Sequence, residues 1–213
     1  VDDIVSEVFK LLPADVPLKK LPTQYIGFSP EHKGFAGTIS LSSNLITSMI
    51  KEVGGQLSEM GFKRLILING HGGQISLLNT AARELRSFAP GMAVFPCFLW
   101  SGVNGLSELL TKTEIEDGLH ASLAETSLML ALKPELVGHE RPNEGMKGKI
   151  PEGWSLEGNA PTSWLTDDFS KTGVIGDSRG ANESLGKNLK ELLINHWFKL
   201  IMNLMQSDWP NNS

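Results

Sequence analysis

The chain has 213 residues, a formal net charge of −5, 40% hydrophobic residues and 20% charged residues. That length suits one domain with a sizeable core, and the composition excludes disordered and collagen-like chains. There is no run of Lys and Arg to follow phosphates, so we expect no nucleic-acid partner. No apolar run approaches the roughly 18 residues of a membrane span. The single cysteine, Cys97, is typical of a cytoplasmic protein.

The sequence opens on Val1 and Asp2, with neither an initiator methionine nor a signal-peptide pattern. We therefore expect that a further N-terminal segment belongs to the protein, and that residues 1–213 form a single domain without that segment.

The first part of the chain mixes helical periodicity with short apolar runs. The predicted elements are a helix over 4–12 ended by Pro13, a strand over 24–27, a polar loop over 29–34, a strand over 35–41, and a helix over 45–60 ended by Gly61.

The remaining chain alternates strands and helices. The predicted elements are a strand over 65–68, a turn over 69–73, a helix over 77–88, a strand over 92–98, a helix over 123–132, an aperiodic stretch over 139–179 and a closing helix over 185–204. The continuous apolar run 65–68 predicts a strand buried on both faces. The alternation predicts an α/β fold with a mainly parallel sheet, and the aperiodic stretch is typical of a functional loop or an oligomer contact.

His71 is the first candidate for chemistry. It lies in the turn Asn69-Gly70-His71-Gly72-Gly73, beyond the carboxyl end of a predicted strand, where α/β sheets bind ligands. The alternative is a structural histidine that caps the next helix or sits in the core with both nitrogens bonded.

The segment from His120 to Ser127 contains the second group of candidates. Ser122 and Glu125 have the spacing of a capping box, in which Glu125 only satisfies a backbone N–H at the start of a helix. The alternative makes Glu125 a metal ligand in the first helical turn, with His120 just before the helix and directed at the same point. The local pattern alone favours the capping box.

Asp2 is the third candidate, and its alternative role is a favourable interaction with a helix dipole. Histidines and carboxylates together suit a divalent cation, which polarises carbonyls and activates water. The sequence has no G-x-S-x-G elbow, and Cys97 lies in a predicted buried strand, so a serine or cysteine nucleophile is disfavoured. The chain also lacks a nucleotide-binding motif.

Four ordered motifs resemble those of the creatininase (creatinine amidohydrolase) family. They are the N-G-H-G-G turn at 69–73, the H-A-x-x-x-E-T-S-L-M-L segment from His120, the F-A-G-T-I-S-L segment at 35–41 and the G-V-I-G-D turn at 173–177. The resemblance runs from residue 1 to about residue 189. It implies a three-layer α/β/α sandwich, a homo-oligomer that is commonly a hexamer, and a site with two divalent ions, Zn, Mn or Fe, that hydrolyses C–N bonds of small amides.

The resemblance also implies roles for individual residues. Asp2 matches a bridging metal ligand, and His71 matches the ligand of the N-G-H motif. We infer, rather than carry over, that Glu125 completes the ligand set and joins the catalytic group. His120 matches the histidine that shuttles a proton to the leaving nitrogen and contacts the substrate. Further substrate contacts are expected from Ser29, the backbone at Gly72, and Trp100.

Three departures from the family pattern limit what the resemblance implies. The E-x-H-G segment, with two further ligands, is expected upstream of Asp2. Glu116 replaces a tryptophan of creatinine-cleaving members, which leaves creatinine uncertain as the substrate. Gln74 replaces an asparagine after the N-G-H-G-G turn.

Two alternatives to a creatinine-type amidohydrolase remain. One is a relative that acts on a formamidopyrimidine, a short peptide or a keto-inositol. The other is a binding or assembly subunit with impaired catalysis, if the upstream ligands are absent from the natural protein. The remaining histidines, His32, His139 and His196, are expected at the surface or in an interface. His32 lies in the loop before the 35–41 segment, and the alternative for this residue is an approach to a pocket.

Overall fold

The computed structural model describes residues 1–145, 150–157 and 160–210. The chain clusters into two compact units. Unit 1 comprises Val1–Ser29, Ile39–Gly102 and Leu193–Ser213, and unit 2 comprises Pro30–Thr38 and Val103–Leu192. The single domain expected for residues 1–213 stays a prediction.

Unit 1 is built on two parallel strands, β1 (Arg64–Asn69) and β2 (Ala93–Phe98), with Arg64 opposite Ala93 and Asn69 opposite Phe98. Both strands were predicted. Within the described residues this sheet has two strands. The helices of the unit are α1 (Asp2–Leu11), α2 (Ser43–Glu59), α3 (Ile75–Phe88) and the last part of α7 (Glu183–Gln206).

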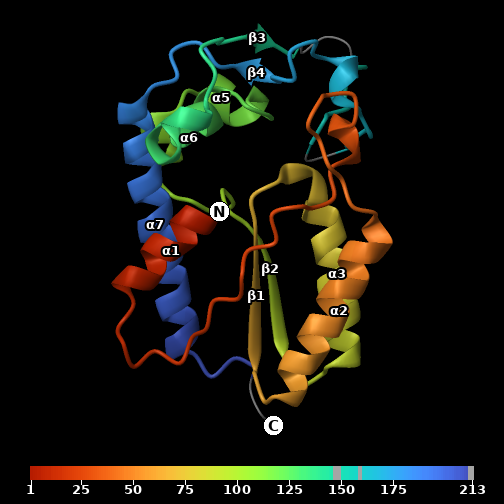
Figure 1. Ribbon diagram of the computed structural model, residues 1–213, viewed down its shortest axis with the longest axis vertical. Coiled ribbons are helices and arrows are strands. Elements are labelled where there is room, and N and C mark those ends of the chain that lie inside the picture. Colours follow the sequence, from red (N-terminus) through yellow and green to blue (C-terminus); the bar gives the residue numbers. More distant parts are fainter. Residues whose placement is uncertain (146–149, 158–159, 211–213) are drawn as a thin grey trace. The chain divides into compact units, whose positions relative to one another are not determined.

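Helices cover both faces of this sheet. Figure 1 shows α2 and α3 on one side of β1 and β2, and α1 with the end of α7 on the other. The three-layer α/β/α arrangement with a parallel sheet is therefore confirmed within unit 1. Trp197 Nε1 of α7 donates a hydrogen bond to the carbonyl of Leu99, 3.0 Å away, which attaches that helix just beyond the end of β2.

The core of unit 1 lies between the sheet and the α2–α3 layer. Its buried residues come from α2, α3 and the approach to β2, and they are Ile46, Ile50, Leu78, Ala81, Leu85, Ala89 and Met92. α2 begins where the Ser42 hydroxyl accepts a hydrogen bond from the Leu45 N–H, at 3.3 Å. The helical spacing of apolar residues predicted both helices because one face of each is buried here.

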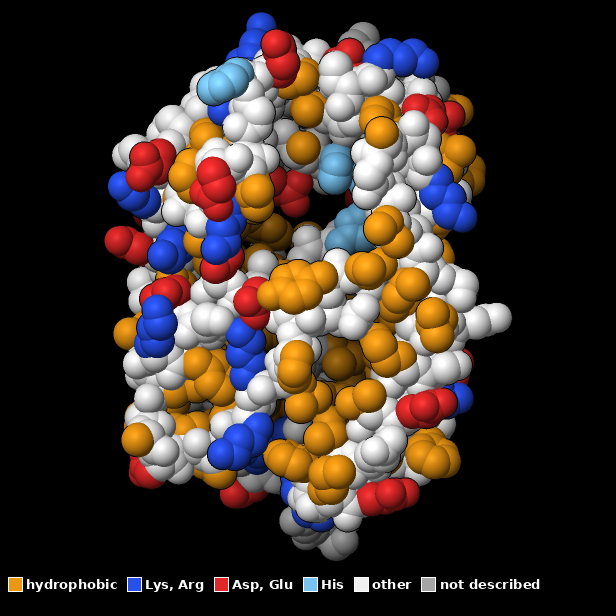
Figure 2. Space-filling model, in the orientation of Figure 1, with side chains coloured by type: hydrophobic (Ala, Val, Ile, Leu, Met, Phe, Trp, Pro, Cys, Tyr) orange, Lys and Arg blue, Asp and Glu red, His pale blue; other side chains and the backbone are white. Residues whose placement is uncertain are grey.

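The prediction that β1 is buried on both faces is wrong. Leu65, Ile66, Leu67 and Ile68 are only half-buried, because the strand lines a cavity of about 380 Å³ inside unit 1. α1, the 18–24 segment, α2 and α7 provide the other walls. Figure 2 shows hydrophobic side chains around a hollow in this unit.

Neither short strand predicted before α2 forms among the described residues 24–27 and 35–41. Gly37 takes a φ of 89°, and the Thr38 N–H donates to the carbonyl of Phe35 at 3.2 Å, so this part of the chain turns instead of extending. Further along, the Leu41 N–H donates to the carbonyl of Gly27 at 2.8 Å. An isolated bond of this kind does not make a ladder.

Unit 2 is made of short elements. They are the 3₁₀ turns Pro30–His32, Pro134–Leu136 and Thr166–Asp168, the helices α4 (Leu106–Leu109), α5 (Lys112–Asp117) and α6 (Leu123–Leu132), the antiparallel pair β3 (Asn143–Glu144) and β4 (Gly176–Asp177), and the first part of α7. Of these, the sequence predicted α6 and α7.

The stretch 139–179, predicted to be aperiodic, contains β3 and β4, while its residues 146–149 and 158–159 lie outside the described part. Glu144 organises this stretch. Its Oε2 accepts hydrogen bonds from the Ser170 hydroxyl and the Lys171 N–H, both at 2.7 Å, and from the N–H and hydroxyl of Thr172. These bonds, first that from Ser170, lower the pKa of Glu144 to about 2.

Among the helices built from described residues, none has the length and apolar character to cross a bilayer.

Candidate metal and proton-transfer residues

The turn after β1 presents His71 on a frame of side-chain amides. The His71 N–H donates to Asn69 Oδ1 at 2.9 Å, and Asn69 Nδ2 donates back to the His71 carbonyl at 2.7 Å. Asn69 is only 4% exposed, so its amide replaces water as the partner of this backbone. The His71 side chain is half-buried. Because both backbone groups of His71 are held, the imidazole leaves the sheet from a fixed point.

Gln74 links this turn to the segment before α2. Its Nε2 donates to Asn69 Oδ1 at 2.8 Å, and its Oε1 accepts from the Phe28 N–H at 3.1 Å. The replacement of the family's asparagine by Gln74 thus gives the turn a second anchor. Next to it, the Cβ position of Gly72 faces open space among the described residues. That opening suits the substrate contact expected at this backbone.

The start of α1 lies against the same turn. A Cβ on Gly70 would collide with the side chain of Val1, so glycine at this position allows the close approach. Asp2 follows directly, and its carboxylate accepts hydrogen bonds from Lys20 Nζ at 2.6 Å, Thr23 Oγ1 at 2.7 Å and Tyr25 OH at 3.1 Å. Lys20 in particular, then Thr23, lowers the pKa of Asp2 to about 2.

Asp2 is therefore ionised over the physiological pH range, as a metal ligand must be. Its present partners include an ammonium group, however, and a divalent cation at the same carboxylate would repel that charge. The ammonium group of Lys20 therefore competes with a cation for this carboxylate. Its role as a bridging ligand stays a prediction.

Two other predicted contacts belong to unit 1. The Ser29 N–H donates to the Ser40 hydroxyl at 2.8 Å. Trp100 is half-buried in the turn after β2, where the Ser101 N–H donates to the Phe98 carbonyl at 3.0 Å. Their roles in substrate binding stay predictions.

In unit 2, His120 is held by its backbone. It forms an antiparallel bridge with Ile175, in which the His120 N–H donates at 3.1 Å and the Ile175 N–H donates back at 2.8 Å. The bridge brings two of the recognised motifs together, because Ile175 belongs to the G-V-I-G-D turn. Ala121 follows with a φ of 50°, a left-handed conformation that alanine rarely adopts and that is most common where other contacts enforce it.

The capping-box interpretation is wrong in its Ser122 half. Ser122 is the N-cap residue of α6, but its hydroxyl makes no capping bond to that helix. It donates instead to Glu114 Oε2 at 2.6 Å and accepts from the Asp177 N–H at 3.0 Å. Glu114, 9% exposed, performs the capping, because its Oε1 accepts from the Ala124 N–H at 2.8 Å. The sequence analysis did not identify this long-range cap.

Glu125 does bind a backbone N–H, but not that of the N-cap residue. Its Oε2 accepts from the N–H of Ala121 at 2.8 Å. The side chain is half-buried, and this bond orients the carboxylate at the start of α6. The geometry is thus compatible with metal ligation by Glu125, which stays a prediction.

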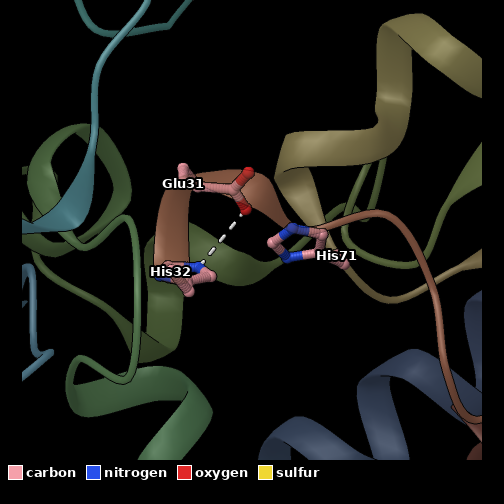
Figure 3. A group of neighbouring side chains, drawn as sticks. All are labelled: Glu31, His32 and His71. Carbon is pink, nitrogen blue, oxygen red and sulfur yellow. Dashed lines mark ion pairs between the residues drawn. The ribbon is translucent and has the colours of Figure 1, made fainter. Parts of the chain in front are cut away.

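His32 was expected at the surface or in an interface, and the structure differs: its residue is 8% exposed. Its Nδ1 lies 2.5 Å from Thr166 Oγ1, its Nε2 lies 3.5 Å from Glu31 Oε1, and its ring packs on that of His120 with centroids 4.0 Å apart. Figure 3 shows Glu31 and His32, with the ion pair between their side chains dashed. The sequence signal for this cluster is the adjacent pair Glu31 and His32, to which the sequence motifs assign no role.

Comparisons with known proteins agree on one family. The profile described as "Creatininase: Creatinine amidohydrolase" matches residues 2–201. A mycofactocin precursor peptide peptidase of Mycobacterium tuberculosis is 29% identical over 168 residues, which are 79% of this chain and 59% of the relative. The chain thus spans less than two thirds of the length of that relative.

Two other relatives have different named activities. The 3-dehydro-scyllo-inosose hydrolase of Thermotoga maritima is 26% identical over 85% of this chain and 64% of its own length. The creatinine amidohydrolase of Pseudomonas putida is 30% identical over 57% of this chain and 52% of its own length.

Solved structures match the fold. A Bacteroides fragilis protein assigned as a creatinine amidohydrolase superposes with a TM-score of 0.79 at 20% identity, covering 97% of this chain and 81% of that protein. A creatininase variant of Zn-Zn type gives 0.71 at 22% identity, with 97% and 81% covered. A creatininase described with Mn gives 0.70 at 20% identity, with 97% and 82% covered.

Proposed function

This chain belongs to the creatininase family, and we propose that it is a metal-dependent hydrolase that cleaves a C–N bond of a small cyclic or linear amide. The observation that carries the proposal is the pair of motif histidines, each fixed by its own local frame. Asn69 holds the backbone of His71 on both sides, and the bridge to Ile175 holds that of His120. Both imidazoles therefore start from fixed backbone positions, and both belong to motifs of the family.

We propose that His71, Asp2 and Glu125 contribute to holding divalent ions, Zn, Mn or Fe, together with the upstream ligands that the resemblance implies. Their donor atoms, one imidazole and two carboxylates, have the chemistry that these cations prefer. Relatives of Zn-Zn and Mn type support that choice. When bound, such ions polarise a carbonyl and make water a nucleophile near neutral pH.

The chain's own residues perform the remaining work. We propose that His120 donates a proton to the leaving nitrogen as the C–N bond breaks, a step in which a positioned acid contributes about 10²–10⁴-fold. The Ala121 N–H donates a hydrogen bond to Glu125 Oε2 at 2.8 Å and thereby orients this carboxylate at the start of α6. Ser29, the Gly72 backbone and Trp100 are proposed to position the substrate.

The substrate is proposed as a linear amide, such as a short peptide, ahead of creatinine. The peptidase relative matches 79% of this chain, whereas the creatinine amidohydrolase matches 57%. Glu116, which stands where creatinine-cleaving members have tryptophan, lies on α5 with its side chain 50% exposed and pairs with Lys112 at 3.6 Å. We also propose that the protein acts in the cytoplasm as a homo-oligomer, for which sedimentation equilibrium would test the hexamer.

The deciding experiment combines metal analysis with a substrate panel. The protein, with its upstream segment where the gene encodes one, is loaded with Zn²⁺ or Mn²⁺ and assayed on creatinine and on short peptide amides. His71→Ala should lose bound metal and turnover together, while the exposed control His139→Ala should lose neither. If His71→Ala retains both, the proposed function is wrong.

A further inference from the structure

His32 is a buried imidazole whose two nitrogens both have partners. Nδ1 faces the Thr166 hydroxyl at 2.5 Å, and Nε2 faces Glu31 Oε1 at 3.5 Å. An ionised carboxylate can only accept, so His32 carries a proton on Nε2, and its Nδ1 shares a hydrogen bond with the Thr166 hydroxyl. Thr166 is fully buried, so water does not compete for this bond. With a partner at each end, the ring cannot rotate about its side-chain axis without breaking one of them.

His120 rests on that fixed ring. The two centroids are 4.0 Å apart and the ring planes are tilted by 32°, so the two imidazoles pack against each other. The backbone of His120 is fixed separately by its bridge to Ile175. The bridge fixes where the side chain starts, and the packing of the two imidazoles fixes how the ring faces. His32, Thr166, Glu31 and His120 all belong to unit 2.

We propose that His32 is a positioning residue, which holds the His120 imidazole in the orientation needed to deliver a proton, and that Thr166 locks His32 in turn. The inference rests on the proposed role of His120 in proton transfer. An acid that must reach one leaving atom is effective only when its ring is aligned, and a misplacement of about 1 Å can cost about 10²-fold in rate. Burying an imidazole, a hydroxyl and a carboxylate in one small cluster is costly unless each is bonded, as they are here.

The test is the mobility of the His120 ring, measured by ¹³C relaxation in the protein labelled at histidine. Five histidines keep the spectrum assignable. In the unaltered protein the His120 ring should have an order parameter near the rigid value of about 0.85. In His32→Ala it should fall below about 0.6, the range of flexible groups. His139→Ala, an exposed change of the same kind, should leave it unchanged.

Two milder variants separate positioning from general loss of structure. His32→Phe keeps a flat ring beside His120 and should retain most of its order. Thr166→Val keeps the side-chain volume and removes the hydroxyl. It should lower the order parameter of the His32 ring strongly and that of the His120 ring to a smaller extent. If His32→Ala fails to fold, the Thr166→Val measurement tests the proposal instead. The proposal is overturned if a folded His32→Ala leaves His120 rigid, if His32→Phe is as mobile as His32→Ala, or if Thr166→Val changes neither ring.

Two controls distinguish this inference from the proposed function. The relaxation measurement uses no turnover, so the two failures are distinguishable: hydrolysis that survives in His120→Ala refutes the proton-transfer role of His120, whereas the order of the His120 ring shows only whether His32 holds that ring. Titration with Zn²⁺ should give the same stoichiometry in the unaltered protein and in His32→Ala. Loss of Zn²⁺ binding in that variant would make His32 a ligand and overturn the positioning role.

Discussion

The turn after β1 and the start of α6 present a histidine in two different ways. His71 leaves a turn whose backbone is held by the amides of Asn69 and Gln74, with open space at Gly72. His120 leaves a strained segment, with Ala121 left-handed, and its ring is packed on another imidazole. An imidazole beside open space suits a ligand that an ion must reach. A ring with one face covered suits a group that must keep a direction.

The largest effect expected from this comparison is on catalysis. His120→Ala should lower turnover by about 10²–10⁴-fold, the usual contribution of a positioned acid, and leave the bound metal in place. Steady-state kinetics together with elemental analysis of the same sample would measure both. If metal is lost along with turnover, His120 is a ligand and the contrast between the two histidines disappears.

The frame around His71 should be the more important for stability. Asn69→Ala removes three hydrogen bonds from a residue that is 4% exposed. We expect the free energy of unfolding to fall by about 2–4 kcal/mol, measured by urea denaturation. Asn79→Ala, on the exposed side of α3, is the control and should change it by less than about 0.5 kcal/mol. Equal losses in the two variants would show that the amide frame is not what stabilises the turn.

At the start of α6 a smaller loss is expected. Glu114→Gln keeps the shape but leaves one acceptor oxygen where two serve Ser122 and the Ala124 N–H. Hydrogen bonds to a charged group contribute about 1.5–3 kcal/mol, so we expect destabilisation within that range in the same urea assay. Glu116→Gln, whose side chain is half exposed, should change stability by about 0.5 kcal/mol or less. If Glu114→Gln is neutral, the start of α6 is held by other contacts.

The smallest effect concerns Glu144 and pH. Its pKa is lowered from 4.5 to about 2 in the folded protein, so its stabilising contribution is complete above pH about 4.5 and is lost as the pH falls toward 2. Glu144→Gln should therefore have a lower melting temperature than the unaltered protein at pH 7. On acidification, the melting temperature of the variant should fall less than that of the unaltered protein. Melting curves from pH 7 to pH 2.5 would measure this. Parallel curves for the two proteins would contradict the assignment.

The longer helices, the strand β1 and the turn after it could be predicted from the sequence, because they depend on local periodicity. Apolar spacing located α1, α2, α3, α6 and α7, and the run from Leu65 to Ile68 located β1. The N-G-H turn could be placed beyond that strand because parallel strands end at a common edge. These features need no knowledge of distant partners.

One of the errors concerns a local backbone conformation, and two concern partners that lie outside the local sequence pattern. Extended-looking residues near Phe35 became a turn because Gly37 took a positive φ. Ser122 and Glu125 had capping-box spacing, yet a carboxylate eight residues before Ser122 took the capping role. His32 was expected at the surface or in an interface, and its buried partner Thr166 lies 134 residues away in the sequence. No local pattern in the sequence contains any of these pairings.

The left-handed Ala121 has a consequence for how the region can change. A glycine there would fit the same φ without strain but would let the chain swivel between the Ile175 bridge and α6, since glycine visits many conformations at little cost. The left-handed conformation of Ala121 costs about 1–3 kcal/mol of local strain. Because alanine has fewer accessible conformations than glycine, the connection between the Ile175 bridge and α6 is rigid. A conformational change within unit 2 should therefore occur at other joints and leave the link between His120 and α6 intact.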